Sequence, residues 1–462
     1  MNTSINKKDI NAKELTGMIG DYIRSHMNEC EKSALRMENY IKHSDLNAGG
    51  NNYTRTMPIP KIFDAETIDH FSKIVTETYG IFEKVIEAYL KDSEYRKLFP
   101  FSKELEELIL LPTGYKEAVP VCRIDIFYNE ENGQFKFCEF NTDGTSAMNE
   151  NKVLDDILYM NNAWTAFEHE VNAGRFELVD SWIDALLETY HSVEGSKEKP
   201  YVAIMDFLDK AYLREFFVFE RHFRAKGIKA EVCDIRHLTY ENGKLLSPTG
   251  HVIDVVYRRA VTSDIMKDYD QVQPFIQAVK EGNVCLIGAF KTQIIHHKAI
   301  NQVLVHPMTK VILTPEENQF IEEHLPKTFE LDKIGEGGLL SKVYEDKDDW
   351  IIKPVDSYAA KGVYAGVDYS HSEWKRIVDG CFGQNYILQE YCRPYLTENI
   401  YFGKKPYEFQ LYSNLTGLYT YNGKFQGVYS RMSDGGIIST QYNEKTVATR
   451  YINKEESEDE TL

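Results

Sequence analysis

Four polar side chains between residues 123 and 141 have the types and the spacing of a candidate metal site. Arg123 and Asp125 stand two positions apart in VCRIDIFY, and Glu139 and Asn141 stand two positions apart in FKFCEFN. Two carboxylates and an amide oxygen are hard ligands, suited to a Mg²⁺ ion that also holds nucleotide phosphates. Such an ion would offset the repulsion between the carboxylates, and Arg123 could bind a phosphoryl group or a carboxylate through two N–H groups. The chemistry indicated for this segment is therefore metal and phosphate binding.

The sequence around these residues predicts a β-hairpin that holds all four of them on one surface. The EENG segment is a turn signal between two strand patterns, and side chains alternate between the two faces of a strand. Taken singly, each pair is more typical of an exposed hairpin with weak surface ion pairs, so that alternative stays open unless another part of the chain supplies phosphate-binding groups. The opposite face would carry Ile124, Ile126, Cys138 and Phe140.

Residues 349–367, DWIIKPVDSYAAKGVYAGV, contain candidate phosphate-binding groups. Lys353 ends a predicted strand and is followed by a loop of small residues that includes Gly362. A lysine can bind phosphates by its charge while backbone N–H groups of such a loop cover them, so we expect residues 356–365 to form a lid. The pattern of a Walker A loop is absent. A surface turn with a solvated lysine is the alternative interpretation.

Three other segments of the second half carry candidate binding residues. Lys298 lies in LIGAFKTQIIHHKAINQVL, an apolar helical pattern in which a lysine can also simply extend its stem along the surface. Gln389 and Glu390 end the strand pattern NYILQE, where they could hydrogen-bond the edge of an adenine ring. Arg431 follows in FQGVYSR, another predicted strand.

The composition is that of an ordinary globular protein with an acidic surface. Of the 462 residues, 42% are hydrophobic and 27% are charged, and the length suggests two or three domains. The formal net charge of −19 opposes binding to nucleic acid or to an anionic membrane, so neither is an expected partner. No apolar run approaches the roughly 18 residues that span a bilayer, and the first residues, MNTSINKKDINAKE, lack the apolar core of a signal peptide. The seven scattered cysteines form no C-x-x-C pair, so we expect a cytoplasmic protein without a disulfide framework or a zinc ribbon.

Hydrophobic periodicity indicates a mixed α+β and α/β protein in five regions. Residues 66–90 have apolar positions three or four apart, which predicts a long helix in a mostly helical amino-terminal region. Alternating strand and helix patterns over 200–260 predict a mainly parallel sheet. Asn422-Gly423 predicts a type I′ hairpin within the short strands that follow residue 340. The predicted regions are 1–110 (helical), 111–195 (hairpin and core), 196–290 (α/β), 291–446 (antiparallel nucleotide-binding lobe) and 447–462 (acidic disordered tail).

Five motifs in this order, R-I-D…E-F-N-T-D, H-K-A-I, I-I-K-P…K-G-V-Y-A-G, L-Q-E-Y and G-V-Y-S-R, resemble the synthetase domain of the glutathionylspermidine synthase family. That family has the ATP-grasp fold in a circularly permuted form, with a Rossmann-like pre-ATP-grasp lobe and an antiparallel nucleotide lobe. The resemblance covers roughly residues 115–440 as a pattern of motifs. It explains why the metal-binding residues precede the nucleotide-binding lysines along the chain.

The resemblance implies roles for twelve residues. It makes Asp125, Glu139 and Asn141 ligands of Mg²⁺ and puts Arg123 and Arg431 at the centre where the phosphoryl and acyl groups are transferred. The remaining positions fall at the nucleotide and at the acyl substrate. Lys298, Lys353 and Gly362 would bind the ATP phosphates, Gln389 and Glu390 would lie near adenine, and Thr145 and Ser146 would hold the acyl substrate.

The activity implied by this resemblance is that of an ATP-dependent carboxylate–amine ligase that forms an amide bond through an acyl phosphate. Its cofactors would be ATP and Mg²⁺, and its substrates a small or peptidic carboxylic acid and an amine, with glutathione and a polyamine as the family's best-known pair. Two alternatives stay open: a small-molecule kinase on the same fold, and a non-catalytic scaffold that binds a peptide or a polyamine.

Overall fold

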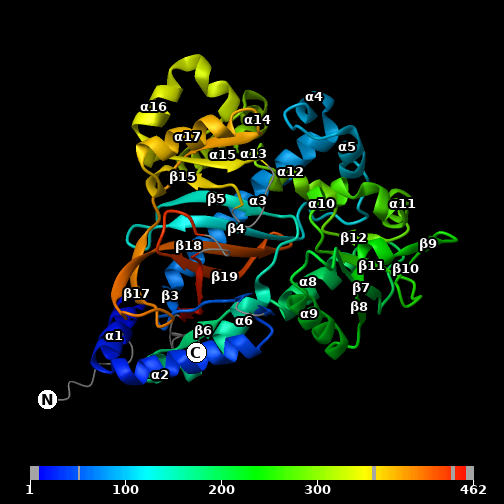
Figure 1. Ribbon diagram of the computed structural model, residues 1–462. Helices are drawn as coiled ribbons and strands as arrows, with labels where there is room; N and C mark the ends of the chain where they lie inside the picture. The colour runs from blue at the N-terminus through cyan, green and yellow to red at the C-terminus, as the bar shows by residue number, and fades with distance from the viewer. Residues whose placement is uncertain (1–9, 50–51, 356–360, 439–442, 454–462) are drawn as a thin grey trace, which may run out of the picture.

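A computed structural model describes residues 10–49, 52–355, 361–438 and 443–453 of the chain. At its centre lies an antiparallel sheet in which strands from the carboxyl-terminal part of the chain lie beside a hairpin from its first third (Figure 1). The strand order is β20-β19-β18-β4-β5, and β17 pairs with the first part of β18. The bounds are Val121–Tyr128 (β4), Phe135–Asn141 (β5), Leu396–Ile400 (β17), Phe409–Tyr421 (β18), Lys424–Ser433 (β19) and Lys445–Val447 (β20).

The hairpin predicted from residues 121–141 is confirmed as β4 and β5. Arg123 is opposite Asn141 and Asp125 is opposite Glu139, but the register shifts between Asp125 and Ile126, where β5 carries one extra residue. Such a bulge re-aims the side chains next to it. The expectation that Cys138 faces away from the polar residues is therefore wrong, because Cys138 lies in the bulge and is only half-buried.

The turn between β18 and β19 is the predicted type I′ hairpin. Asn422 and Gly423 have φ angles of 48° and 78°, the left-handed values that this turn needs at both central positions. β18 is long enough to pair with β19 on one side and with both β17 and β4 on the other.

One face of the central sheet packs against α3 (Ala65–Lys91), which lies behind the sheet in Figure 1 and matches the helix predicted over 66–90. The buried face of α3 includes Phe71, Ile74 and Phe82, in the same core as Ile124 and Ile126 of β4. This apolar layer is why the polar residues of the hairpin must face the other way. The neighbouring helices are α4 (Ser93–Arg96), α5 (Lys103–Ile109) and α12 (Gln293–His296).

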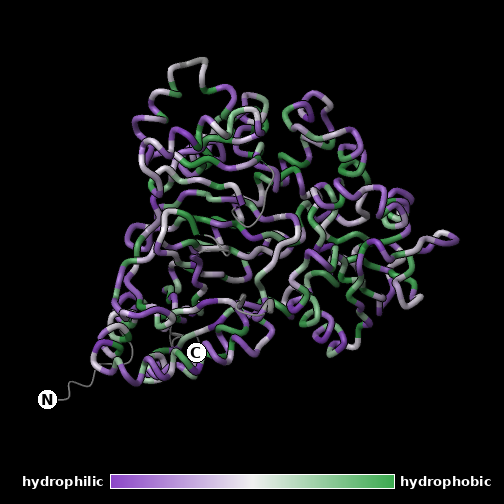
Figure 2. Tube along the Cα trace, viewed as in Figure 1, coloured by the Kyte–Doolittle hydropathy of each residue, from purple (hydrophilic) through white to green (hydrophobic). Residues whose placement is uncertain are grey.

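The α/β region predicted over 200–260 is confirmed as a parallel sheet in the order β12-β11-β7-β8, at the right of Figure 1. Its strands are mostly hydrophobic along their length in Figure 2, as expected for a parallel sheet covered on both faces. The bounds are Tyr201–Asp206 (β7), Lys229–Asp234 (β8), Val255–Arg258 (β11) and Cys285–Ile287 (β12), with helices Asp180–His191 (α8), Leu213–Ala225 (α9), Thr262–Lys267 (α10) and Gln273–Lys280 (α11) and a β9–β10 hairpin at Thr239–Glu241 and Lys244–Leu246.

A second antiparallel sheet, in the order β13-β16-β14-β15, stands above the central sheet in Figure 1. Two helices pack on it around a separate apolar core that includes Ile352, Trp374 and Leu388. The bounds are Thr328–Glu330 (β13), Trp350–Pro354 (β14), Tyr364–Ala365 (β15), Tyr386–Glu390 (β16), Leu339–Glu345 (α16) and His371–Cys381 (α17). The preceding segment holds α13 (Ile300–Val303), α14 (Pro307–Ile312) and α15 (Pro315–His324).

The predicted single lobe over 291–446 is divided between two sheets. Residues 328–390 build the second sheet, whereas the chain from Leu396 onward returns to the central sheet and pairs with the amino-terminal hairpin. Strand patterns show alternation within one strand but do not show its pairing partner, so this division could not be predicted from them.

The predicted tail begins later than residue 447. Residues Thr449–Ile452 form β21, which pairs with β3 (Lys61–Asp64) and β6 (Ala173–Arg175). The acidic run that motivated the prediction follows this strand, and residues 454–462 lie outside the described residues.

The small three-stranded sheet that contains β21 is covered by the amino-terminal helices α1 (Ala12–Ser25) and α2 (Met27–His43), which share a core with it. The same region holds β1 (Asn47–Gly49), β2 (Asn52–Tyr53), α6 (Met148–Asp156) and α7 (Asn162–Thr165). Among the described helices, none has the length and apolar character that crossing a membrane requires.

Candidate active site

A cavity of about 590 Å³ is lined by residues of the central sheet, the parallel sheet and the second antiparallel sheet. It contains side chains from ten of the twelve positions predicted from the sequence, although these positions are spread over 300 residues of the chain. Asp125 and Gly362 are the two predicted residues outside its lining. The ten are Arg123, Glu139, Asn141, Thr145, Ser146, Lys298, Lys353, Gln389, Glu390 and Arg431.

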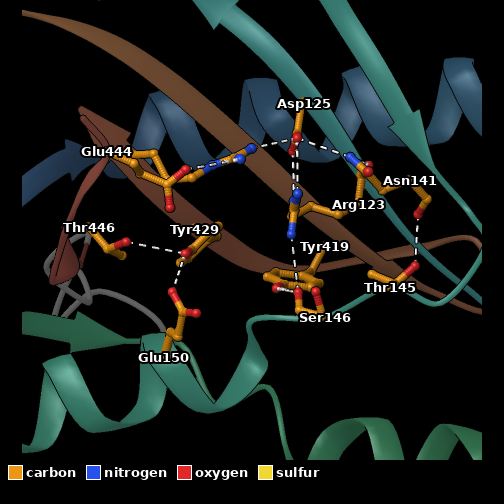
Figure 3. A network of polar contacts seen from close by, with 11 residues as sticks. Arg123, Asp125, Asn141, Thr145, Ser146, Glu150, Tyr419, Tyr429, Glu444 and Thr446 are labelled. Atoms are coloured by element: carbon orange, nitrogen blue, oxygen red, sulfur yellow. Dashed lines mark hydrogen bonds and ion pairs between the residues drawn. The ribbon is translucent and has the colours of Figure 1, made fainter. Parts of the chain in front are cut away.

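Asp125 lies behind the cavity wall, between two arginines (Figure 3). Arg123 donates to both carboxylate oxygens, with Nε–Oδ1 and Nη2–Oδ2 distances of 2.7 and 3.1 Å, and Arg431 donates to Oδ2. The amide of Asn141 also donates to Oδ2, at 3.0 Å. Burial alone would raise the pKa of Asp125, but Arg123 and Arg431 hold that pKa below its ordinary value. The carboxylate is thus charged and shared between two guanidinium groups.

The neighbouring strand leaves room for this cluster at Gly417 of β18, which is directly opposite Asp125. A Cβ atom at Gly417 would lie 2.8 Å from both Arg123 Cδ and Asp125 Oδ1, closer than van der Waals contact allows. A side chain at position 417 would therefore displace Arg123 or Asp125.

The residues at this wall fit a Mg²⁺ ion held by two protein ligands. Glu139 and Asn141 line the cavity, and Asn141 directs its amide nitrogen at Asp125, which leaves its oxygen for a cation. Mg²⁺ is commonly bound by one or two carboxylates together with substrate phosphates, so two donors suffice. Asp125, the third predicted ligand, does not line the cavity, and its buried carboxylate accepts one hydrogen bond at Oδ1 and three at Oδ2. Among the described residues, no three His, Cys, Asp or Glu side chains gather into a metal site.

The second sheet contributes the basic part of the cavity. Lys353, at the end of β14, is nine-tenths buried and donates to Gln389 Oε1 of β16 at 2.8 Å. Gln389 in turn donates to Thr328 Oγ1 at 2.8 Å, which fixes the orientation of its amide. Lys298 is half-buried and lies in a turn between α12 and α13, and not inside one helix as its apolar surroundings predict.

The predicted lid falls partly on residues that the structure does not describe. Residues 356–360 lie outside the described residues, and residues 361–365 lead into β15. Gly362 has a φ of 72°, and a Cβ at this position would lie 2.8 Å from Tyr386 Oη. Its neighbour Val363 lines the cavity.

The loop after β5 connects the hairpin to α6 and carries two of the predicted residues. The backbone carbonyl of Ser146 accepts a hydrogen bond from Arg123 Nη1 at 3.1 Å and another from Tyr419 Oη. Thr145 Oγ1 donates to the carbonyl of Asn141 at 2.8 Å. Arg123 therefore holds both Asp125 behind the wall and the loop in front of it.

The parallel sheet contributes cavity residues that sequence reasoning missed. Arg259 Nη2 forms a buried ion pair with Glu215 Oε1 at 2.8 Å, and burial raises the pKa of Asp206 to about 6. Asp206 ends β7, and Arg259 directly follows β11. Ligands of open parallel sheets bind at the carboxyl ends of the strands, so the polar residues after YVAIM and IDVVY were an available signal.

A second missed group surrounds Glu150, in the first turn of α6 (Figure 3). Tyr429 donates to Glu150 Oε2, and the Tyr429 oxygen lies 3.2 Å from Thr446 Oγ1. Glu444 Oε2 lies 3.7 Å from Arg431 Nη1. Burial and the negative charge of Glu444 raise the pKa of Glu150 to about 7. In the sequence, Glu150 was indistinguishable from the acidic residue that begins many helices.

Comparisons with known proteins show what this fold resembles. No family model and no curated protein matches the chain. A glutathione synthetase-like effector from Globodera pallida, solved in its apo form, matches 91% of this chain and 96% of its own with a TM-score of 0.59 at 12% identity. The chain thus has the same overall fold as that synthetase-like protein.

Two more distant solved structures also match. A protein from Methylobacillus flagellatus KT named "Putative gamma-glutamylcysteine synthetase" matches 85% of this chain and 90% of its own, with 11% identity and a TM-score of 0.41. A D-cycloserine synthetase matches 55% of this chain and 91% of its own, with 10% identity and a TM-score of 0.28.

Proposed function

We propose that this protein is an ATP-dependent ligase that joins a carboxylic acid to an amine through an acyl phosphate. One observation carries the proposal: Glu139 and Asn141, the arginines 123 and 431, and the lysines 298 and 353 all line one cavity. Acidic, amide and basic groups in that combination suit a metal-bound triphosphate and a second anionic substrate. The likeness of the fold to a glutathione synthetase-like protein supports the same reaction class.

ATP would lie against the second sheet. Lys353 and Lys298 would contact its phosphates, and Gln389 and Glu390 would lie near the adenine edge. Lys353 and Gln389 are already hydrogen-bonded to each other, so both would meet the nucleotide as one oriented pair. Residues 361–365, the described part of the predicted lid, would cover the phosphates and exclude water, which would otherwise hydrolyse an acyl phosphate.

Mg²⁺ would be held by Glu139 and the amide oxygen of Asn141, and when bound it supplies positive charge at the phosphates. Asp125, predicted as a third ligand, would act one layer behind by orienting Asn141, Arg123 and Arg431. Residues that orient the ligands of a metal are a regular part of such sites.

Arg123 and Arg431 would stabilise the phosphoryl group during its transfer from ATP to the acid substrate. The carboxylate of the acid substrate attacks the γ-phosphorus of ATP and ADP leaves. The amine nitrogen then attacks the acyl carbon of the acyl phosphate, and inorganic phosphate leaves. Arg123 and Arg431 are fixed by Asp125 with their guanidinium groups at the cavity wall, where they can stabilise the charge on the transferring phosphoryl group without reorganising. Thr145 and Ser146, in the loop that Arg123 holds, would bind the acid substrate.

The finer assignment that we propose is a relative of glutathionylspermidine synthase with a circularly permuted ATP-grasp arrangement, acting in the cytoplasm. It is supported by the order of the motifs along the chain, with the hairpin residues first and the lysines later. The acid would be a small molecule or a peptide, and the amine can be a polyamine.

The test is an ADP-release assay with pooled peptide acids and amines, followed by mass spectrometry of the products. We expect ADP formation that requires both an acid and an amine, and transfer of labelled carboxylate oxygen into phosphate. In Glu139→Ala, the rate of ADP formation should fall by at least about a hundredfold, because the variant lacks the carboxylate that would hold Mg²⁺ beside the ATP phosphates. A stable phosphorylated product would indicate the kinase instead, and ADP release that is independent of any acid would overturn the ligase.

A further inference from the structure

Glu150 stands next to the groups that would carry out the transfer. Its helix α6 begins two residues after Ser146, whose carbonyl accepts from Arg123. On its other side, Tyr429 holds Glu150 and is two positions before Arg431 on β19. Glu150 also lines the cavity. Through Ser146 and Tyr429, the Glu150 carboxylate is held close to both arginines, and its position in the cavity lining lets a substrate reach it.

The charges around Glu150 leave it without a dedicated cation. The nearby arginines already form ion pairs with other carboxylates. Arg123 pairs with Asp125, and Arg431 pairs with Asp125 and Glu444. Arg259 pairs with Glu215. The titratable groups that interact with Glu150 include Glu444 beside β20, Glu215 of α9, Arg123 of β4 and three tyrosines, Tyr212 before α9, Tyr419 of β18 and Tyr429 of β19. Among the described residues, no ion pair joins Glu150 to a lysine, an arginine or a histidine. A positive group in the cavity would therefore be attracted to this carboxylate.

Amide formation needs a base at this stage of the reaction. A primary amine is protonated near neutral pH, and an ammonium nitrogen has no electron pair with which to attack the acyl carbon. Two protons must leave the nitrogen in total, and phosphate can take only one of them as it departs as HPO₄²⁻.

We propose that Glu150 is the general base that removes the first proton from the attacking ammonium group of the amine substrate. The inference rests on the ligase function proposed above. The ammonium group transfers a proton to the Glu150 carboxylate, and its nitrogen attacks the acyl carbon. The C–O bond to phosphate breaks, and the second proton goes to the departing phosphate. Glu150 then returns its proton to solvent.

The surroundings of Glu150 suit this task. A general base works best when its pKa lies near the working pH, and burial with the negative charge of Glu444 raises the pKa of Glu150 to about 7. The Tyr429 hydroxyl donates to Oε2, which fixes the carboxylate and leaves Oε1 for the substrate. The Tyr429 hydroxyl also lies within hydrogen-bond distance of Thr446, so its position is held by a second residue besides Glu150.

The test compares two nucleophiles on wild-type enzyme and on Glu150→Gln. The first nucleophile is an amine substrate. It is taken from the acid–amine pair that gives the fastest ADP release in the assay above, and glutathione with spermidine is the first pair assayed. The second is hydroxylamine, which is unprotonated at neutral pH and needs no base to trap an acyl phosphate as a hydroxamate. We expect the variant to lose about 10²–10⁴-fold in kcat/KM for the amine, with hydroxamate formation within a few-fold of wild type.

The pH profile gives an independent readout. In the wild type, kcat/KM for the amine should fall below about pH 7 as Glu150 takes up a proton, and this limb should be missing from the variant's residual activity. Glu444→Gln should move the limb to lower pH, because it removes a negative charge that raises the pKa of Glu150.

The outcomes separate the two proposals. If the wild type forms neither ADP nor hydroxamate with any acid, the ligase function itself is overturned. If the wild type is active and Glu150→Gln either keeps its amine activity or loses both activities equally, Glu150 is not the base. Urea unfolding of both variants shows whether a loss of both activities comes from a damaged fold.

Discussion

At the scale of single residues, Asp125 shows how the members of one motif can take different positions relative to a cavity. Of the four residues in the R-x-D and E-x-N pairs, Arg123, Glu139 and Asn141 line the cavity, and Asp125 lies behind its wall. Alternation puts Asp125 on the same face, and the sequence contains no sign that Arg431 would come to the same carboxylate. The burial of Asp125 is produced by a strand that is distant along the chain.

Asp125→Asn tests its role as an anchor. Two buried guanidinium groups would lose the charge they share, and removing one partner of a buried ion pair costs about 3–5 kcal/mol. We expect the urea midpoint to fall accordingly and ligase activity to be lost. The matched control is Glu139→Gln, half-buried at the cavity wall, which should lose activity at nearly wild-type stability. Equal stability of the two variants would contradict the anchoring role.

At the scale of elements, most local predictions agree with the structure, although Lys298 lies in a turn and not in a helix, and the pairing of distant strands was not predicted. The hairpin, the α3 helix, the type I′ turn and the parallel βαβ units follow from periodicity and turn chemistry, which act over a few residues. The bulge at Cys138 and the return of β17–β20 to the central sheet depend on pairing partners. The candidate site was predictable where motifs carried it. Glu150 was missed because it looks like any acidic residue at a helix start, whereas Asp206 and Arg259 stand at the carboxyl ends of predicted strands, a signal that the motifs did not include.

The turn that leads into β15 gives a prediction at this scale. Gly362→Ala would put a side chain in a left-handed conformation and against the Tyr386 hydroxyl, which costs about 1–3 kcal/mol in strain. We expect weaker ATP binding, measured by calorimetry, together with a lower Tm. Gly380→Ala in α17 is the control, because nothing lies within 4 Å of its Cβ and alanine favours a helix. A Gly362→Ala protein that binds ATP as tightly as Gly380→Ala would refute a role for this turn.

At the scale of the whole molecule, the buried carboxyl group of Glu150 makes the free energy of unfolding depend on pH. Glu150 has its pKa raised from 4.5 to about 7, so between these values the native state keeps a proton that the unfolded chain has released. The free energy of unfolding therefore falls as the pH rises through this window.

Glu150→Gln should remove this dependence. Compared with the wild type, the variant should gain stability on going from about pH 5 to about pH 8, measured as the difference in urea unfolding free energy. Asp206, whose pKa is raised to about 6, stays in both proteins and cancels in the comparison. A difference that stays constant across this range would show that Glu150 titrates normally.

The pairing of β18 with β4 also has a consequence for how the chain is made. Arg431 follows Asp125 by 306 residues, so the ribosome releases the hairpin long before its neighbouring strand and its second arginine exist. Until then, one edge of β4 carries unsatisfied backbone groups, and Asp125 has only one of its two counter-ions. Such an edge can pair with other chains, so a nascent chain of this protein is exposed to edge-to-edge association until β18 has been translated.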